Sequence, residues 1–183
     1  MIVVKVGGSL FDHPRLIPAL RAYLDTLPEP VLLVPGGGVV ADAVRHLDEV
    51  HQLGEEAAHW LALRAISVWA KTMRHSLRAV DPASRLNVLD AHQFALDDES
   101  RPGALPHSWA VTSDSIAARA GVVFGASRLI LLKSIDIPPQ TPWSAAAANG
   151  WVDTHFPIVI ADATFPIEVV NFRTHLEQFS HPA

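Results

Sequence analysis

The sequence predicts an α/β protein, a three-layer αβα sandwich around a mostly parallel sheet. Three observations support this fold class. Apolar runs of strand length alternate with segments in which apolar residues recur at helical spacing. Two of these runs end in glycine turns that lead into helices, and 49% of the 183 residues are hydrophobic. This length and composition predict a globular chain, and we expect a single domain over residues 1–183.

The first half of the chain predicts two strand–helix units followed by a long helix. Apolar residues at helical spacing follow the first strand, and two closely spaced prolines then end that helix. The expected elements are a strand from Ile2 to Val6, a helix from Pro14 to Leu27, a strand from Val31 to Val34, and helices from Gly36 to Leu47 and from Glu55 to Val80.

The helix expected from Glu55 to Val80 has an unusually wide apolar face. Such a face fits either a helix in the centre of the core or one that packs on another subunit. Both interpretations remain open, and the second leads us to expect a homodimer or a larger homo-oligomer.

The second half predicts shorter elements. They are a short strand and a turn over Leu86 to Leu96, a loop over Asp97 to His107, a strand from Trp109 to Thr112, a helix from Ser113 to Phe124, and strands at Leu129 to Leu132, Ile158 to Ile160 and Glu168 to Val170. The central run at Leu129 is continuously apolar, as expected for a buried parallel strand. Ser113 or Asp114 is a natural N-cap for the helix that follows Thr112.

The two glycine turns carry the main functional signal. The first is Gly7-Gly8-Ser9, and the second is Gly36-Gly37-Gly38. Each exposes backbone N–H groups at the positive end of a helix dipole, which favours an anion. Glycine lets a phosphate approach the backbone where a Cβ would block it. Together the turns can face two phosphate groups, or one phosphoryl group that passes between two molecules.

Further polar residues are expected at the same edge of the sheet. Lys5, the turn after Val34, the segment from Thr112 to Asp114, and Lys133 all fall at carboxyl ends of strands, where ligands bind in such sheets. Phosphoryl transfer needs alignment and charge stabilisation, and the two lysines would supply positive charge. Asp114 either positions the lysines by ion pairing, which we favour, or caps its helix.

Three residues are candidates for recognition of the acceptor. Asp42 offers a carboxylate to an ammonium group, and Arg45 can pair with a phosphate in bidentate fashion. His59 can hydrogen-bond to a substrate. A solvated helix position for Asp42 and a half-buried structural role for His59 remain open alternatives.

The motifs resemble those of a known superfamily. Val4 to Ser9, Pro35 to Gly38 and Val111 to Ala118 are similar to the corresponding segments of the amino acid kinases. Members of that superfamily are αβα sandwiches that transfer the γ-phosphoryl group of Mg-ATP to a carboxylate, carbamate or phosphate oxygen. Ala41 to Arg45 and Val152 to Pro157 extend the likeness to its short branch of aminomethylfuran-methyl phosphate kinases, which serve methanofuran-type cofactor biosynthesis.

The resemblance implies a role for each motif, with Asp114 organising the lysines. The residues implied near ATP are Lys5, Gly7, Gly8, Ser9, Lys133, Ser134 and Asp136. The residues implied near the acceptor and the transferred group are Gly36, Gly37, Gly38 and Ser113. Mg²⁺ would be held largely by the ATP phosphates, so no protein ligand is named.

The sequence departs from the superfamily pattern in two places. Larger members carry a late lysine that grips the transferred phosphate, whereas no lysine follows Lys133 here. Lys133 serves that role, an arginine such as Arg173 helps, or catalysis is weak. In the expected nucleotide loop, Asp136 is followed by Ile137-Pro138-Pro139, in which the two prolines remove N–H donors.

Composition excludes several function classes. The net charge of −5 and the absence of a basic stripe argue against nucleic-acid binding. No apolar run is long enough to span a membrane, no leader is visible and cysteine is absent, so we expect a cytoplasmic protein. The ten histidines lack metal-ligand spacing, so we expect no metal site made of protein side chains.

These observations predict an ATP-dependent kinase that acts on a small phosphorylated or carboxylated metabolite, with aminomethylfuran-methyl phosphate as the sharper hypothesis. Kinases for an amino acid or a nucleoside monophosphate remain alternatives. So does a non-catalytic relative that binds nucleotide or an oxyanion through the glycine turns.

Overall fold

The computed structural model describes residues 1–78, 85–161 and 163–178 of the chain. Within these residues, five strands form a parallel sheet in the order β3-β2-β1-β4-β5. The strands are β1 (Ile2–Val6), β2 (Val31–Pro35), β3 (Leu86–Val88), β4 (Arg128–Lys133) and β5 (Ile167–Asn171). The predicted parallel sheet is therefore confirmed.

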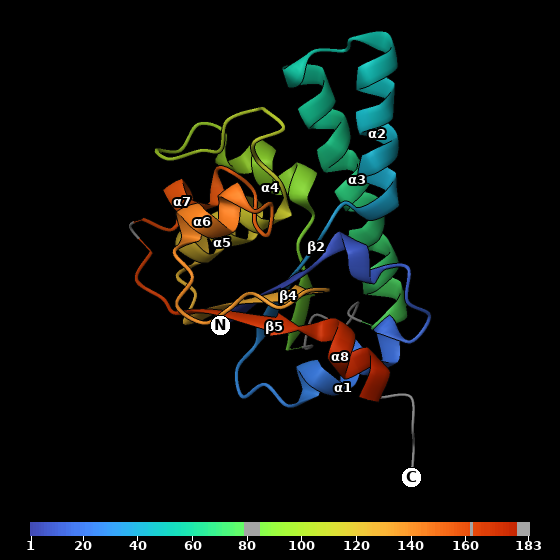
Figure 1. Ribbon diagram of the computed structural model, residues 1–183, viewed down its shortest axis with the longest axis vertical. Coiled ribbons are helices and arrows are strands. Elements are labelled where there is room, and N and C mark those ends of the chain that lie inside the picture. The colour runs from blue at the N-terminus through green and yellow to red at the C-terminus, as the bar shows by residue number, and fades with distance from the viewer. Residues whose placement is uncertain (79–84, 162, 179–183) are drawn as a thin grey trace.

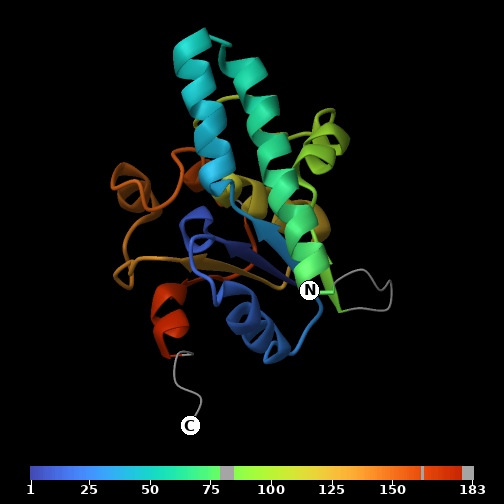
Figure 2. The same cartoon turned by 90° about the vertical axis from the view of Figure 1, so that its right-hand side faces the viewer.

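Helices cover both faces of this sheet (Figure 1). Helices α1 and α8 lie on one face and α4 to α7 on the other, while α2 and α3 form a hairpin that rises beyond the sheet (Figure 2). The helices are η1 (Gly8–Leu10), α1 (Leu16–Asp25), α2 (Gly38–His51), α3 (Glu55–Ser76), α4 (Ala91–Asp98), α5 (Ser113–Phe124), α6 (Trp143–Ala148), α7 (Phe156–Val159) and α8 (Phe172–Gln178). None of these described helices combines the length and apolar character needed to cross a bilayer.

The pleat of the central strands divides the core into two layers. Val3 packs with residues of α3 and α5, whereas Val4 and Val6 pack with residues of α1 and α8. Because side chains alternate along a strand, Lys5 lies on the same face as Val3. By the same alternation, Lys133 lies on the α5 face, two residues beyond Leu131, the β4 partner of Lys5. Both lysines therefore end their strands on the face covered by α5.

The predicted strand from Trp109 to Thr112 is wrong. This segment has no regular secondary structure and leads directly into α5. The N–H and hydroxyl groups of Thr112 donate to the carboxylate of Asp153, so these donors are satisfied without a neighbouring strand. The N-cap of α5 is Thr112 rather than Ser113 or Asp114, and the Thr112 side chain makes no capping bond.

Two other local predictions are also wrong. The turn expected before Leu96 is helix α4, whose N-cap Asp90 accepts a hydrogen bond from the N–H group of Gln93. The strand expected at Ile158 to Ile160 falls largely in the single helical turn α7. A short apolar run fits a buried helical turn as well as a strand, so periodicity alone does not separate the two.

The predicted long helix is confirmed, but it ends at Ser76 with Leu77 as its C-cap, earlier than expected; Val80 itself lies outside the described residues. It buries a face that includes Leu63, Ile66 and Met73, as expected for a core helix, while Leu61 and Val68 remain exposed.

The two glycine turns pack directly against each other. A Cβ on Gly8 would lie 2.4 Å from the backbone nitrogen of Gly38, and a Cβ on Gly36 would lie 2.5 Å from the backbone nitrogen of Gly8. Gly38 also has a φ of +51°, which L side chains rarely adopt. Glycine is therefore required to bring the ends of β1 and β2 together.

A Gly8→Ala substitution is expected to destabilise the fold by about 1–3 kcal/mol, because the backbones of the two turns would have to separate. Urea denaturation measures the change. Gly125→Asn is the matched control, since Gly125 has a φ of +63° with open space around it and asparagine tolerates that conformation. An equal loss in both variants would contradict close packing of the turns.

Candidate active site

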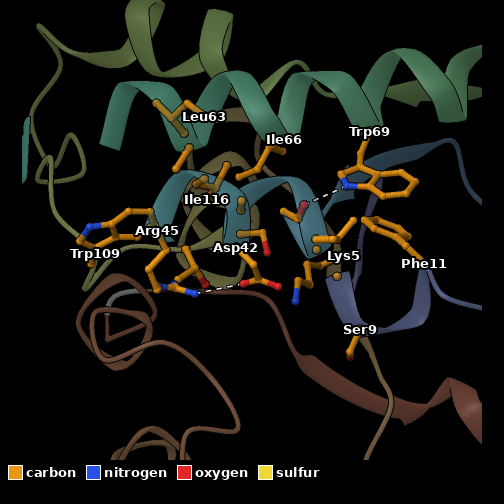
Figure 3. A pocket seen from close by; sticks show the side chains of 18 of the residues that line it. Lys5, Ser9, Phe11, Asp42, Arg45, Leu63, Ile66, Trp69, Trp109 and Ile116 are labelled. Carbon is orange, nitrogen blue, oxygen red and sulfur yellow. Dashed lines mark hydrogen bonds and ion pairs between the residues drawn. The ribbon is translucent and has the colours of Figure 1, made fainter. Parts of the chain in front are cut away.

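A cavity of about 730 Å³ opens at the carboxyl edge of the sheet. Its walls come from the end of β1, the η1 turn, α2, α3 and the segment that leads into α5 (Figure 3). Arg45 and Trp109 lie toward one end, Ser9 and Phe11 lie toward the other, and Lys5 points into the space between them. This is the edge at which the sequence predicted a binding site.

A buried cluster of two lysines and one aspartate lies beside this cavity. The ammonium group of Lys5 is 3.0 Å from Oδ1 of Asp114, and that of Lys133 is 2.8 Å and 2.7 Å from its two carboxylate oxygens. All three side chains are less than a tenth exposed. The ion-pairing role favoured for Asp114 is thus present in the geometry, whereas a capping role is not.

The environment of the cluster shifts the pKa values of Asp114 and Lys133. Burial alone would raise the pKa of Asp114, but the two lysine ammonium groups outweigh burial and hold that pKa below its usual value. Burial and repulsion from Lys5 lower the pKa of Lys133 to about 8, against the attraction of Asp114. Two ammonium groups share one carboxylate, so the cluster carries a net positive charge when both lysines are protonated.

Asp153 fixes the start of α5, where Asp114 lies. Its carboxylate accepts hydrogen bonds from the N–H and hydroxyl groups of Thr112, from the same two groups of Ser115, and from the N–H group of Phe156. These bonds bracket Asp114 in the chain. Asp153 is therefore a positioning residue for the lysine cluster, a role that no sequence pattern indicated.

The second glycine turn is held in place by aromatic side chains. The indole N–H group of Trp69 donates to the carbonyl oxygen of Gly37 at 2.8 Å, and the Trp69 ring stacks on Phe11 with centroids 4.1 Å apart (Figure 3). Phe11 follows the first turn, so this stack ties the two turns together.

The far end of the cavity carries polar groups on α2. Arg45 pairs with Asp42 at 3.1 Å, and its guanidinium lies 4.7 Å from the ring centroid of Trp109. The indole N–H group of Trp109 donates to Asp48. About half of the Arg45 side chain is exposed, so it can exchange Asp42 for another anion.

His59 lies at the base of this end and is buried. Its ring stacks on His107, which contacts Glu56 through Nδ1 at 2.9 Å. Burial, and then the nearby His107, lower the pKa of His59. A neutral ring of this kind fits the structural role and still leaves His59 on the cavity wall.

Most of the residues predicted to bind ligands line the cavity. They are Lys5, Gly8, Ser9, Gly37, Gly38, Asp42, Arg45, His59 and Ser113. Asp114 and Lys133 lie behind this wall, where Asp114 pairs with Lys5 and Lys133 pairs with Asp114. Ser134 shares a hydroxyl hydrogen bond with Ser9 at 2.8 Å.

Besides Asp114, Lys133 and Ser134, three other predicted residues do not line the cavity. Gly7 is buried and donates its N–H group to Leu132, and Gly36 is buried against Gly8. Asp136 is exposed on the segment after β4. The structure therefore gives the two glycines a packing role and leaves Asp136 apart from the cavity wall.

The cavity wall also contains residues that the sequence analysis did not assign to a site. They are Phe11, Asp12, Ala62, Leu63, Ile66, Trp69, Trp109, Val111, Ile116, Gly150 and Arg173, with Val39 and Ala41. Thr112 also lines the wall, from a segment that was expected at this edge. The aromatic residues belong to no recognised motif, and Arg173 was named only as an arginine that helps where the late lysine is absent. Among the described residues, no group of three or more acidic or histidine side chains is placed to hold a metal ion.

An Asp153→Asn substitution is expected to destabilise the fold by about 1–3 kcal/mol, because an amide cannot accept all of the bonds that the carboxylate accepts. Urea denaturation measures the loss. Asp25→Asn removes the same charge at an exposed position and should have little effect. Equal stability of the two variants would contradict the positioning role.

Comparison with known proteins gives one related sequence and several related structures. No family model matches the chain. The chain is 27% identical to [5-(aminomethyl)furan-3-yl]methyl phosphate kinase from Methanocaldococcus jannaschii, over 94% of this chain and 88% of that protein.

Two of the structural neighbours are uridylate (UMP) kinases. The enzyme from Archaeoglobus fulgidus superposes with a TM-score of 0.65 at 15% identity, over 97% of this chain and 96% of that one. UMP kinase from Ureaplasma parvum gives 0.61 at 14% identity, over 93% and 88%. All of these relatives are kinases, in agreement with the predicted enzyme class of phosphotransferase. The sequence similarity and the shared fold confirm the predicted resemblance to the amino acid kinase superfamily.

Proposed function

We propose that the protein is an ATP-dependent kinase that transfers the γ-phosphoryl group to a phosphate oxygen of a small acceptor. The observation that carries the proposal is the buried Lys5–Asp114–Lys133 cluster next to the contact between the two glycine turns. The sharper hypothesis is an enzyme of methanofuran-like cofactor biosynthesis that phosphorylates an aminomethylfuran-methyl phosphate, as the name of the archaeal relative indicates for that protein.

The first glycine turn and its surroundings fit the phosphates of ATP. Gly8 and Ser9 line the cavity, and Ser9 and Ser134 place two hydroxyl groups together at its edge. Gly8 presents backbone without a Cβ at this part of the wall. Asp136 remains a candidate for the nucleotide side, although it is exposed and lies off the cavity wall.

The other end of the cavity fits the acceptor. Arg45 can exchange Asp42 for the acceptor phosphate, and the carboxylate of Asp42 would then be available to an ammonium group. Leu63, Ile66 and Ile116 supply an apolar wall for a small ring. A phosphate on the acceptor would pair with Arg45, an amine would pair with Asp42, and an aromatic ring would pack on the apolar wall.

In this mechanism the protein aligns two phosphates and stabilises charge on the group that moves between them. Lys5 points into the cavity and would contact the transferred phosphoryl group, and Asp114 keeps its ammonium group in place. Lys133 adds a second positive charge behind Lys5. Mg²⁺, held by the ATP phosphates, would neutralise charge on the donor.

Two further properties are proposed. The exposed Leu61 and Val68 on α3 support association into a homodimer or larger homo-oligomer. A cytoplasmic location is consistent with a chain that lacks cysteine and uses ATP.

The direct test supplies Mg-ATP and [5-(aminomethyl)furan-3-yl]methyl phosphate and measures ADP release. We expect turnover for the wild-type protein and a loss of about 100- to 1,000-fold in kcat/KM for Lys5→Met, because a preorganised charge at the reacting group is removed. Lys71→Met removes an exposed lysine and should behave like wild type.

A panel of amino acids and nucleoside monophosphates belongs in the same assay. Turnover with one of these acceptors alone would reassign the substrate. Equal activity of Lys5→Met and wild type would contradict the proposed role of Lys5, and binding without turnover on any acceptor would favour a non-catalytic protein.

The lowered pKa of Lys133 predicts an alkaline limit to activity. Values of kcat/KM are expected to fall as the pH rises through about 8, because the buried ammonium group loses its proton there. Stability should move in the opposite direction. Between pH 8 and 10.5 the folded state binds fewer protons at Lys133 than the unfolded state, so this residue makes the free energy of unfolding rise with pH.

Because kcat/KM should fall while the free energy of unfolding rises, a loss of activity caused by titration of Lys133 can be distinguished from one caused by unfolding. Activity profiles and urea denaturation at matched pH values provide the measurement, and Lys133→Met should lack the alkaline step. A flat kcat/KM profile from pH 7 to 9.5 in the wild-type enzyme would refute the assignment.

A further inference from the structure

Arg173 reaches the cavity from the far end of the chain. It is the second residue of α8, directly after β5, and its guanidinium crosses to the η1 region. There Nη1 lies 3.0 Å from Oδ1 of Asp12, and Nη2 donates to the carbonyl oxygen of Ser9 at 2.7 Å. A second contact of Nη2 with Asp12 is 3.4 Å long. The side chain therefore lies at the end of the cavity that we assign to the phosphate donor.

The cationic side chains on the cavity wall differ in their partners and in the end of the cavity at which they lie. Three cationic side chains are among the described residues that line the cavity: Lys5, Arg45 and Arg173. Lys5 is paired with Asp114, and Arg45 lies at the acceptor end. Arg173 is thus the cation in this lining that is placed beside Ser9, whereas a donor polyphosphate brings several negative charges to that end.

The partner of Arg173 can be displaced. The Asp12 side chain is 68% exposed, whereas that of Arg173 is 29% exposed. An ion pair with an exposed member contributes little to stability. The guanidinium fork matches phosphate geometry, and a polyphosphate offers more charge than one carboxylate. The Arg45–Asp42 pair at the opposite end has the same form.

We propose that Arg173 is a binding residue for the donor polyphosphate. Asp12 forms an ion pair with the Arg173 guanidinium in the absence of the donor, and the donor phosphates replace the Asp12 carboxylate when they bind. This inference rests on the proposed function and deepens it by assigning a donor-phosphate ligand from α8. It differs from a purely structural role, in which Arg173 and Asp12 only tie α8 to the first glycine turn.

Calorimetric titration distinguishes the two roles, because they predict opposite changes in donor affinity for the Asp12→Asn variant. The probes are a non-hydrolysable ATP analogue with Mg²⁺ and, to isolate the phosphates from the base, inorganic triphosphate with Mg²⁺. For Arg173→Met we expect about tenfold weaker binding of both probes. For Asp12→Asn we expect tighter binding than wild type, because the competing carboxylate is gone. A structural tie instead predicts that both variants bind more weakly.

Two more variants sharpen the result. Arg173→Lys keeps the charge without the fork and should fall between wild type and Arg173→Met. Arg128→Met removes an arginine that pairs with Glu168 at the start of β4, and its binding should match wild type. Thermal unfolding of each variant monitors folding. If Arg173→Met does not fold, the opposite shifts of Asp12→Asn and Arg173→Lys still decide the question.

The outcomes also distinguish this inference from the proposed function. Wild-type affinity in Arg173→Met, together with weaker binding in Lys5→Met, would overturn the role of Arg173 and leave the kinase proposal standing. Weaker binding in Asp12→Asn would overturn it in favour of the structural tie. A folded wild-type protein that binds neither probe would overturn the proposed function and this inference with it.

Discussion

The structure depends on placing two lysine ammonium groups on one buried carboxylate. Lys5, Asp114 and Lys133 come from β1, α5 and β4, and each is less than a tenth exposed. Unpaired charges at such depth would be costly, so the three elements must be positioned together. The register of β1 with β4 brings the lysines to the same face, and the bonds of Asp153 fix the start of α5 above them. The same arrangement therefore pairs the buried charges and places Lys5 on the cavity wall.

The cavity extends this arrangement outward. Contact between the glycine turns brings the ends of β1 and β2 together, and Gly8, Gly37 and Gly38 form part of the cavity wall together with Lys5. At each end an arginine rests on an exposed aspartate, Arg45 on Asp42 and Arg173 on Asp12. The interior charges are therefore paired in a buried cluster, while the outer ion pairs each have an aspartate that is open to solvent. A site that joins two phosphate-bearing molecules needs this combination, because the reacting centre must be preorganised and the substrates must enter and leave.

Sequence patterns predicted the elements whose signals are local. The apolar runs of β1, β2 and β4 and the helix α5 were found at or near their observed bounds, because buried parallel strands and glycine turns have distinctive compositions. The segment from Trp109 to Thr112 was wrongly predicted as a strand, since only Val111 enters the core and the segment does not join the sheet. The same ambiguity affected α7, where four residues are too few for a period to be recognised.

The fold class, the edge of the sheet at which the cavity opens, and the lysines and aspartate that meet there could be predicted from the amino-acid sequence, because each follows from strand ends and helix starts that are visible as local patterns. Tertiary structure decided which residues close the cavity around them. Trp69, Trp109 and Arg173 line its wall, and Asp153 positions the start of α5 beneath it. The contacts that place these residues join positions up to 164 residues apart in the chain. Such contacts depend on how separate elements pack, and no spacing along the chain records that packing.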